Sequence, residues 1–279
     1  DSIDKVVLTI KEEGNVINIY YTKKTDLSYV VNYLEKDTNK VLKDQKVELN
    51  QTYGTQINAN NEIVAIDGYV YDSIDKQVLV IEDKENVINI YYTKRNDLSY
   101  TVNYLEKNTN KVIHEAKTEE NQIFGTIIDT EDEIIDIDGY VYDSADKESL
   151  TITTGENVIN LYYTKRNDLS YIVNYLEKGT NIVLHEPKIE GGQEYGAIIS
   201  GENEIIEIEG YRYDSIDKTV LTIDIENNVI NIYYTKRNDL SYIVNYLEKD
   251  TNEVIHEPKT TGNQEYGTEI YSRNEVIDI

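Results

Sequence analysis

Short stretches of the chain alternate between apolar and polar residues, which is the period-two pattern of a half-buried β-strand. The stretch 98–105 is the clearest example, and its apolar face carries Leu98, Tyr100, Val102 and Tyr104. By contrast, the stretch 158–163 has apolar residues on both faces, which favours a central position in a sheet. Similar but shorter runs predict further strands at 112–114, 139–142 and 150–152.

The segment 127–137 lies between these strands, and its isoleucines fit one face of a helix as well as one face of a strand. We predict a short helix or helical turn near Glu131–Ile135. The order of elements is then a hairpin of two strands, a crossing segment and three further strands. A right-handed crossover would place the first and last strands side by side and parallel. The predicted fold class is α+β, rich in β, with a small mixed sheet of the β-grasp (ubiquitin-like) kind.

The whole pattern recurs with a constant period of 71 residues, which is the signature of tandem modules. Leu-Ser-Tyr begins at residues 27, 98, 169 and 240, and Asp-Ser begins at residues 1, 72, 143 and 214. We expect whole modules at 25–95, 96–166 and 167–237, although a unit that begins near residue 72 fits the same period. Residues 1–24 are then the back part of an earlier module, and residues 238–279 are the front part of a later one. The sequence therefore predicts a window from a longer array.

Successive modules are joined by a short connection that contains neither Gly nor Pro, such as Thr-Lys-Arg-Asn-Asp at 164–168. Such a connection is stiffer than a Gly/Ser linker, so we expect the modules to form an extended rod. The basic residues of the joint are either solvated or form salt bridges to the acidic ends of a neighbouring module. These joint residues are Lys94, Arg95, Lys165, Arg166, Lys236 and Arg237.

The composition excludes several classes of function. The net charge of −26 argues against nucleic-acid binding, which needs a basic surface that displaces counterions. No apolar run approaches the ~18 residues of a membrane span, so we expect no membrane insertion in this segment. The chain has no Cys, which excludes disulfides and thiolate metal sites. The 26 tyrosines supply nearly all of the aromatic surface.

Few residue clusters suggest chemistry, and we expect neither enzymatic activity nor a cofactor. His114, His185 and His256 occupy equivalent positions, but the first module has Lys43 there, which favours a structural role. Calcium is a weaker hypothesis, with Asp136, Asp138 and Asp143 as candidate ligands. The alternative is a solvated acidic edge that discourages strand pairing between molecules. We expect every lysine in a loop, which argues against an internal Lys–Asn isopeptide cross-link.

Adjacent tyrosines in the last strand of each module place one ring on each face of the sheet. Most of this surface is expected to be core and sheet face, but the remaining rings could stack on sugars. An acidic module would repel acidic mucin, so binding would need neutral sugars or a bridging cation. The candidates for glycan contact are Tyr91, Tyr92, Tyr162, Tyr163, Tyr233 and Tyr234.

Several motifs together resemble the MucBP (mucin-binding protein) repeat of Gram-positive surface proteins. They are Tyr100–Lys111 (YTVNYLEKNTNK), Gly125, the IDGY motif at 137–140 and the closing strand at 158–163. The resemblance covers every whole module, and it departs from the family where the first hairpin has Asn-Thr-Asn in place of Asp-Gly. It implies tandem β-grasp modules in a secreted, wall-anchored adhesin or stalk at the bacterial cell surface. No residue-level mucin site transfers with it.

Three functions follow from these observations. The leading hypothesis is a non-enzymatic stalk or fibre segment that projects a distal domain, with the neighbouring repeats as its partners. The second is a set of adhesin repeats that bind mucin or other host glycans. The third is a fibre subunit that assembles by lateral packing or strand exchange.

Overall fold

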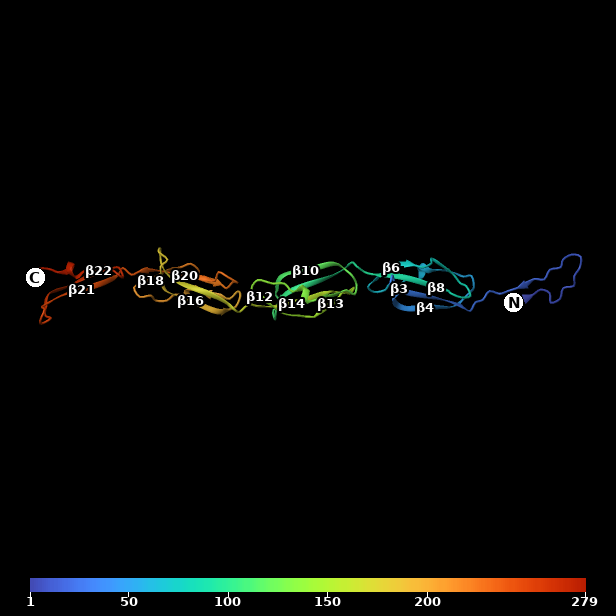
Figure 1. Ribbon diagram of the computed structural model, residues 1–279, viewed down its shortest axis with the longest axis horizontal. Helices are drawn as coiled ribbons and strands as arrows, with labels where there is room; N and C mark the ends of the chain where they lie inside the picture. The colour runs from blue at the N-terminus through green and yellow to red at the C-terminus, as the bar shows by residue number, and fades with distance from the viewer. The chain divides into compact units, whose positions relative to one another are not determined.

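The computed structural model describes residues 1–279, and its regular structure is almost entirely β-strand (Figure 1). The first complete set of strands comprises β3 (Leu27–Glu35), β4 (Val41–Gln51), β5 (Gln56–Asn58), β6 (Tyr69–Ile74), β7 (Val78–Val80) and β8 (Val87–Lys94). Four of them form a mixed sheet in the order β4-β3-β8-β6, and β5 pairs with β7 separately. β3 is antiparallel to β4 and parallel to β8, so the first and last strands of the repeat are adjacent and parallel, as predicted.

The same set of strands recurs twice with the 71-residue period, again as a four-stranded mixed sheet and a two-stranded sheet. The second set is β9 (Leu98–Glu106), β10 (Val112–Gln122), β11 (Ile127–Asp129), β12 (Tyr140–Ala145), β13 (Ser149–Thr151) and β14 (Val158–Lys165). The third set is β15 (Leu169–Glu177), β16 (Val183–Gln193), β17 (Ile198–Ser200), β18 (Tyr211–Ile216), β19 (Val220–Thr222) and β20 (Val229–Lys236). Two further pairs of strands are β1 (Ser2–Ile3) with β2 (Ile19–Tyr20), and β21 (Leu240–Leu247) with β22 (Val254–Gln264).

Helical geometry is limited to four short 3-10 turns, so the α part of the predicted α+β class is wrong. The turns are η1 (Ala59–Glu62), η2 (Glu131–Glu133), η3 (Gly201–Glu204) and η4 (Ser272–Glu275). The short helix or helical turn expected near Glu131–Ile135 is a 3-10 turn of three residues, and the backbone of Ile134 after it is extended (φ −72, ψ 130). None of these turns has the length or the apolar character needed to cross a bilayer.

The hydrophobic cores of the first and third repeats use the inward faces of the two parallel strands. In the first repeat Val31, Ile88 and Ile90 are fully buried, and residues of the short β5–β7 sheet cover them. All members of this core lie between Leu27 and Tyr92, and those of the third repeat lie between Leu169 and Tyr234. Alternation of apolar and polar positions, the pattern that predicts the strands, therefore also selects the core.

The chain divides into two compact units, and the division passes through the middle repeat. The first unit contains Asp1–Tyr104, Val112–Ile134 and Ala145–Leu161, and the second contains Leu105–Lys111, Ile135–Ser144 and Tyr162–Ile279. The module boundaries expected from the period stay a prediction.

Asparagine replaces glycine in the first hairpin of the repeat. Asn108 and Asn110 have φ values of +69° and +55°, and the position of Asn108 is Gly179 in the third repeat. Asn tolerates the left-handed region better than other non-glycine residues. The departure from Asp-Gly is therefore compatible with the same turn.

Candidate functional site: the joints between repeats

A backbone contact that involves three segments marks each joint between repeats. At the first of these joints Arg95 donates its N–H to the carbonyl of Gly68 at 2.9 Å, and its own carbonyl accepts from the N–H of Phe124 at 2.8 Å. The joint peptide is thus bonded to the preceding repeat and to the following one. The same pair of bonds links Arg166 to Gly139 and Tyr195, and Arg237 to Gly210 and Tyr266.

An aromatic ring of the following repeat lies directly on the glycine of the preceding one. A Cβ atom at Gly68 would lie 2.4 Å from the ring carbons of Phe124, and the backbone of Gly68 has φ +78°. The same ring meets Tyr69 edge to face, with centroids 5.7 Å apart. Glycine is therefore favoured twice, by the space under the ring and by the left-handed backbone. The equivalent contacts pair Gly139 and Tyr140 with Tyr195, and Gly210 and Tyr211 with Tyr266.

The arginines of the joint bind carboxylates within the joint itself. Arg95 donates from Nε and Nη2 to the two oxygens of Asp97, both at 2.9 Å, and this bond holds the pKa of Asp97 below its usual value. Because the partners are two residues apart, the pair spans the boundary between residues 95 and 96 and stiffens the connection. Arg166 with Asp168 and Arg237 with Asp239 repeat this geometry.

Two lysines of the joints lie near acidic residues of both flanking repeats. Nζ of Lys165 lies 3.9 Å from Glu106 of its own repeat and 3.3 Å from Glu194 of the next. Lys236 lies 3.7 Å from Glu177 and 4.0 Å from Glu265. At the preceding joint the position of Glu194 is Ile123, so Lys94 has no such acid across the joint. The acids across the joint, Glu194 and Glu265, are 60% exposed, and pairs at exposed positions contribute about 1 kcal/mol or less.

The structure separates the two tyrosines of each candidate glycan-contact pair. Tyr92, Tyr163 and Tyr234 are about 1% exposed, and their hydroxyls donate to backbone carbonyls of the crossing segment, those of Val64, Ile135 and Ile206. Burial leaves these three rings no face for a sugar, so their candidacy is wrong. Tyr91, Tyr162 and Tyr233 lie on the opposite face of the sheet and are half-buried. They stay candidates.

The weak calcium candidates do not converge on one point. Asp136 and Asp138 are exposed, and Asp143 accepts from Nζ of Lys107 at 2.5 Å and from the hydroxyl of Ser144 at 2.6 Å. The bond from Lys107 holds the pKa of Asp143 below its usual value. No group of three or more acidic or histidine side chains in the chain is arranged to hold a metal ion. The histidines pack on the sheet instead, as His114 does against Tyr104 with centroids 5.3 Å apart.

An ionic cluster that the sequence did not predict recurs in four copies, and its carboxylate is buried in the three whole repeats. In the second repeat Glu133 accepts from the hydroxyl of Tyr100 at 2.7 Å and from Nζ of Lys117 at 2.8 Å. Burial and the neighbouring carboxylate raise the pKa of Tyr100 to about 12. The other clusters are Tyr29, Glu62 and Lys46; Tyr171, Glu204 and Lys188; and Tyr242, Glu275 and Lys259.

These four lysines lie in strands β4, β10, β16 and β22, so the expectation that every lysine is in a loop is wrong. The signal in the sequence is the recurrence of all three residue types at the 71-residue spacing in four copies. The Glu carboxylate has a cation and a neutral hydroxyl as its partners. This arrangement neutralises a buried charge and offers no free nucleophile, so we interpret it as structural.

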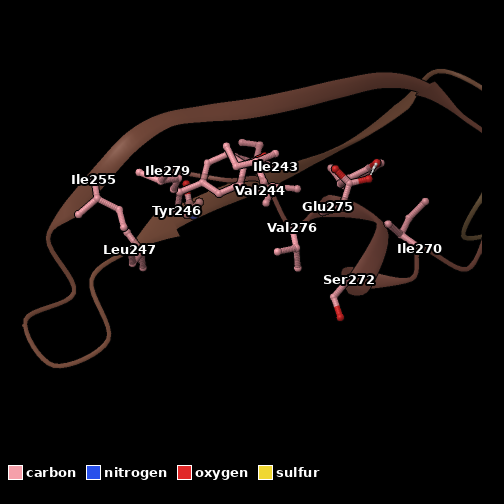
Figure 2. A pocket seen from close by; sticks show the side chains of 13 residues that line it. Ile243, Val244, Tyr246, Leu247, Ile255, Ile270, Ser272, Glu275, Val276 and Ile279 are labelled. Atoms are coloured by element: carbon pink, nitrogen blue, oxygen red, sulfur yellow. Dashed lines mark hydrogen bonds between the residues drawn. The ribbon is translucent and has the colours of Figure 1, made fainter.

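One apolar groove of about 650 Å³ runs along β21. Figure 2 shows that Val244 and Tyr246 of β21 and Val276 after η4 line it. The equivalent Val173 and Tyr175 are buried by β20, which pairs in parallel with β15, whereas β21 pairs only with β22. The lining of the groove is therefore the face of β21 that forms the core in the whole repeats.

No protein-family model matches the chain, and no curated protein matches it. Among solved structures, the chain is similar to domains 3-4 of the Streptococcal High Identity Repeats in Tandem (SHIRT) from a cell surface protein. The identity is 12%, the match covers 50% of this chain and 98% of that one, and the TM-score is 0.22. The structure also matches Mub-RV, a mucin-binding protein repeat. That match has 11% identity, covers 50% of this chain and 99% of the other, and has a TM-score of 0.19.

A third match is the pilus adhesin SpaC from Lactobacillus rhamnosus GG in its open conformation. Its identity is 9%, it covers 75% of this chain and 43% of that one, and its TM-score is 0.15. The match to Mub-RV is the resemblance that the motifs predicted. All three TM-scores lie below 0.5, so none of these matches carries an argument about function.

Proposed function

We propose that this chain is a non-enzymatic structural segment, a stalk of tandem β-grasp modules that projects a distal domain from a bacterial cell surface. The observation that carries the proposal is the joint, where a ring of one repeat covers Gly68, Gly139 or Gly210 of the repeat before it. A chain whose modules act independently gains nothing from such contacts. A stalk needs them, because they restrict the angle between neighbours.

The charge of the chain supports the same proposal. With 53 acidic against 27 basic residues, the acidic surfaces of neighbouring repeats repel one another, and the joint contacts hold these repeats together against the repulsion. The arginine–aspartate pairs add stiffness within the connection. Stiff joints and mutual repulsion both help a stalk to hold a distal domain away from the cell surface.

The test uses spin labels, which can be placed freely because the chain has no Cys. Labels at Lys111→Cys and Ile182→Cys occupy equivalent exposed positions in consecutive repeats. We expect a narrow distance distribution in the parent chain and a broader one after Gly139→Ala, since the new Cβ would lie 2.5 Å from the ring of Tyr195. Gly155→Ala is the control, because only the hydroxyl of Thr153 lies near, at 3.6 Å. A parent distribution as broad as that of Gly139→Ala would contradict the proposal.

A second candidate is glycan binding, favoured by the half-buried rings of Tyr91, Tyr162 and Tyr233 on the face away from the core. A glycan array tests it with the whole chain. Binding that is lost on Tyr91→Ala, Tyr162→Ala and Tyr233→Ala together, with folding retained, would favour an adhesin over a spacer.

A third candidate is a self-assembling fibre, favoured by the edge strands β10 and β16, whose outer edges pair with no other strand of the chain. Small-angle scattering over a range of concentrations tests this, because a particle size that does not grow with concentration excludes assembly.

A further inference from the structure

We infer that each whole repeat is a mechanical clamp, in which the first and last strands resist tension applied along the chain. The inference rests on the proposed stalk only for its biological use. The resistance itself is a property of the sheet. If the sheet resists tension in this way, the function of the repeats is to bear force.

The order of strands places the clamp between the two points where force enters. The chain enters the first repeat at Leu27, the start of β3, and leaves it at Lys94, the end of β8. β3 and β8 are parallel neighbours, in register from Val30 with Val87 to Glu35 with Tyr92. Because the strands are parallel, these two points lie at opposite ends of the pair. Tension therefore slides the strands along each other, and the bonds between them share the load.

The other strands lie outside this path. β4 pairs with the far side of β3, and β6 pairs with the far side of β8. Pulling the ends of the repeat therefore cannot peel off an edge strand before the central pair yields. An antiparallel hairpin pulled at its open end would instead lose its bonds one at a time.

Hydrogen bonds close the clamp at both ends and in the middle. Val30 donates its N–H to the carbonyl of Asn86 at 2.9 Å, and Lys36 donates to the carbonyl of Tyr92 at 2.8 Å. Between them the side chain of Asn32 donates to Oδ1 of Asn89 at 2.9 Å. The third repeat has the same closure, in which Asn174 donates to Asn231 at 2.8 Å.

The core keeps water away from one side of the clamp. Val31, Ile88 and Ile90 of the two strands are fully buried, and their equivalents Val173, Ile230 and Ile232 are buried in the same way. Water that competes for a strained bond lowers the barrier to breaking it, since the competing hydrogen bond replaces the lost one. A dry face therefore raises the force at which the pair separates.

The test is single-molecule force spectroscopy on the whole chain in two directions. Cysteines at Asn167→Cys and Asn238→Cys load the third repeat in shear, because they flank the start of β15 and the end of β20. Cysteines at Asn167→Cys and Glu226→Cys load the same two strands at one end, so that they peel apart. We expect a high unfolding force in shear and a much lower one in peeling. Equal forces in both directions would overturn the inference.

A pair of variants separates mechanical resistance from ordinary stability. Asn174→Ala removes the side-chain bond across the clamp, and Tyr171→Phe removes a side-chain bond to Glu204 that does not cross it. We expect both to lower stability in denaturant but only Asn174→Ala to lower the shear force. A loss of force with Tyr171→Phe as large as that with Asn174→Ala would contradict the clamp.

The label-distance experiment on the joints gives an independent result. A broad distribution of label distances together with a high unfolding force in shear would contradict the stalk but leave the clamp intact. A narrow distribution of label distances together with a low unfolding force in shear would contradict the clamp but leave the stalk intact.

Discussion

At the scale of single residues, the buried Glu of each repeat is the least expected feature. Glu133 is 6% exposed, and a buried carboxylate without partners would be strongly destabilising. Lys117 reaches it from the edge strand β10 while remaining 39% exposed at its own side chain. The cluster therefore ties the crossing segment to the sheet with one charge pair and one hydroxyl.

This cluster predicts a loss of stability at alkaline pH. The folded repeat raises the pKa of Tyr29 and Tyr100 from 10.0 to about 12, so it holds protons that the unfolded chain releases above pH 10. The contribution of these tyrosines to the free energy of unfolding is complete below pH 10. It should fall by about 1.4 kcal/mol per pH unit for each tyrosine between pH 10 and 12. The carboxylate also raises the pKa of Lys117, which acts in the same direction.

Denaturant unfolding at pH 8, 10 and 11 measures this loss. The chain with Tyr29→Phe, Tyr100→Phe and Tyr171→Phe should be less stable at pH 8 but lose less stability towards pH 11. Parallel pH curves for the parent and the triple variant would exclude the cluster as the cause.

The contacts of Asp143 predict that calcium does not change the thermal stability of the chain. It already accepts bonds from Lys107 and Ser144, and Asp136 and Asp138 do not converge with it. We expect the same thermal midpoint in millimolar calcium and in chelator. A midpoint that rises with calcium and no longer does so after Asp136→Asn and Asp138→Asn would restore the metal hypothesis.

At the scale of elements, the connection from β7 to β8 depends on one asparagine side chain. Asn86 accepts from the N–H of Glu82 at 2.8 Å and donates to the carbonyls of Glu82 at 2.7 Å and Ser28 at 3.0 Å. The side chain thus closes the turn and fastens it to β3. Asn157 and Asn228 do the same in the later repeats.

Removing this side chain should loosen one repeat. Asn157→Ala leaves the N–H and carbonyl of Thr153 and the carbonyl of Ser99 without their partner, and we expect a loss of about 2–4 kcal/mol. Hydrogen exchange read by mass spectrometry should show faster exchange in β13 and β14. Lys111→Ala, at an exposed position whose backbone is not left-handed, is the control. Equal exchange in the two variants would show that the turn does not depend on Asn157.

Some elements could be predicted from the sequence and others could not, for physical reasons. The strands β9 and β14 follow from alternation, because one face of each strand is buried. β10 is predicted as three residues but has 11, since an edge strand with mostly exposed side chains has the composition of a loop. The joint contact also escapes sequence analysis, because a Gly and a ring 56 positions apart meet only once both repeats are folded.

At the scale of the whole molecule, the net charge of −26 sets the balance between repulsion and local pairing. Most of the ion pairs are exposed, so they contribute little, whereas repulsion among 53 acidic residues acts throughout. Repulsion between exposed charges is screened over about 10 Å at 0.1 M salt.

Added salt should therefore stabilise the chain. We expect the thermal midpoint to rise when sodium chloride increases from low concentration to about 0.15 M, where the Debye length is about 8 Å. Calorimetry measures it, with sodium perchlorate at equal ionic strength as a control for specific anion effects. A midpoint that falls with salt would show that attraction within ion pairs exceeds repulsion.

The near identity of the repeats has a consequence for how the chain acquires its native pairing. β8 and β20 share the sequence VINIYYTK, and β14 differs from them only in one Leu. Any of the three would fit beside β3 as well as its own partner does. Synthesis on the ribosome removes the ambiguity, because the correct strand is the first copy to emerge after β3. A denatured full-length chain has no such order, so its refolding should be slowed by swapped repeats that must come apart before they can correct themselves.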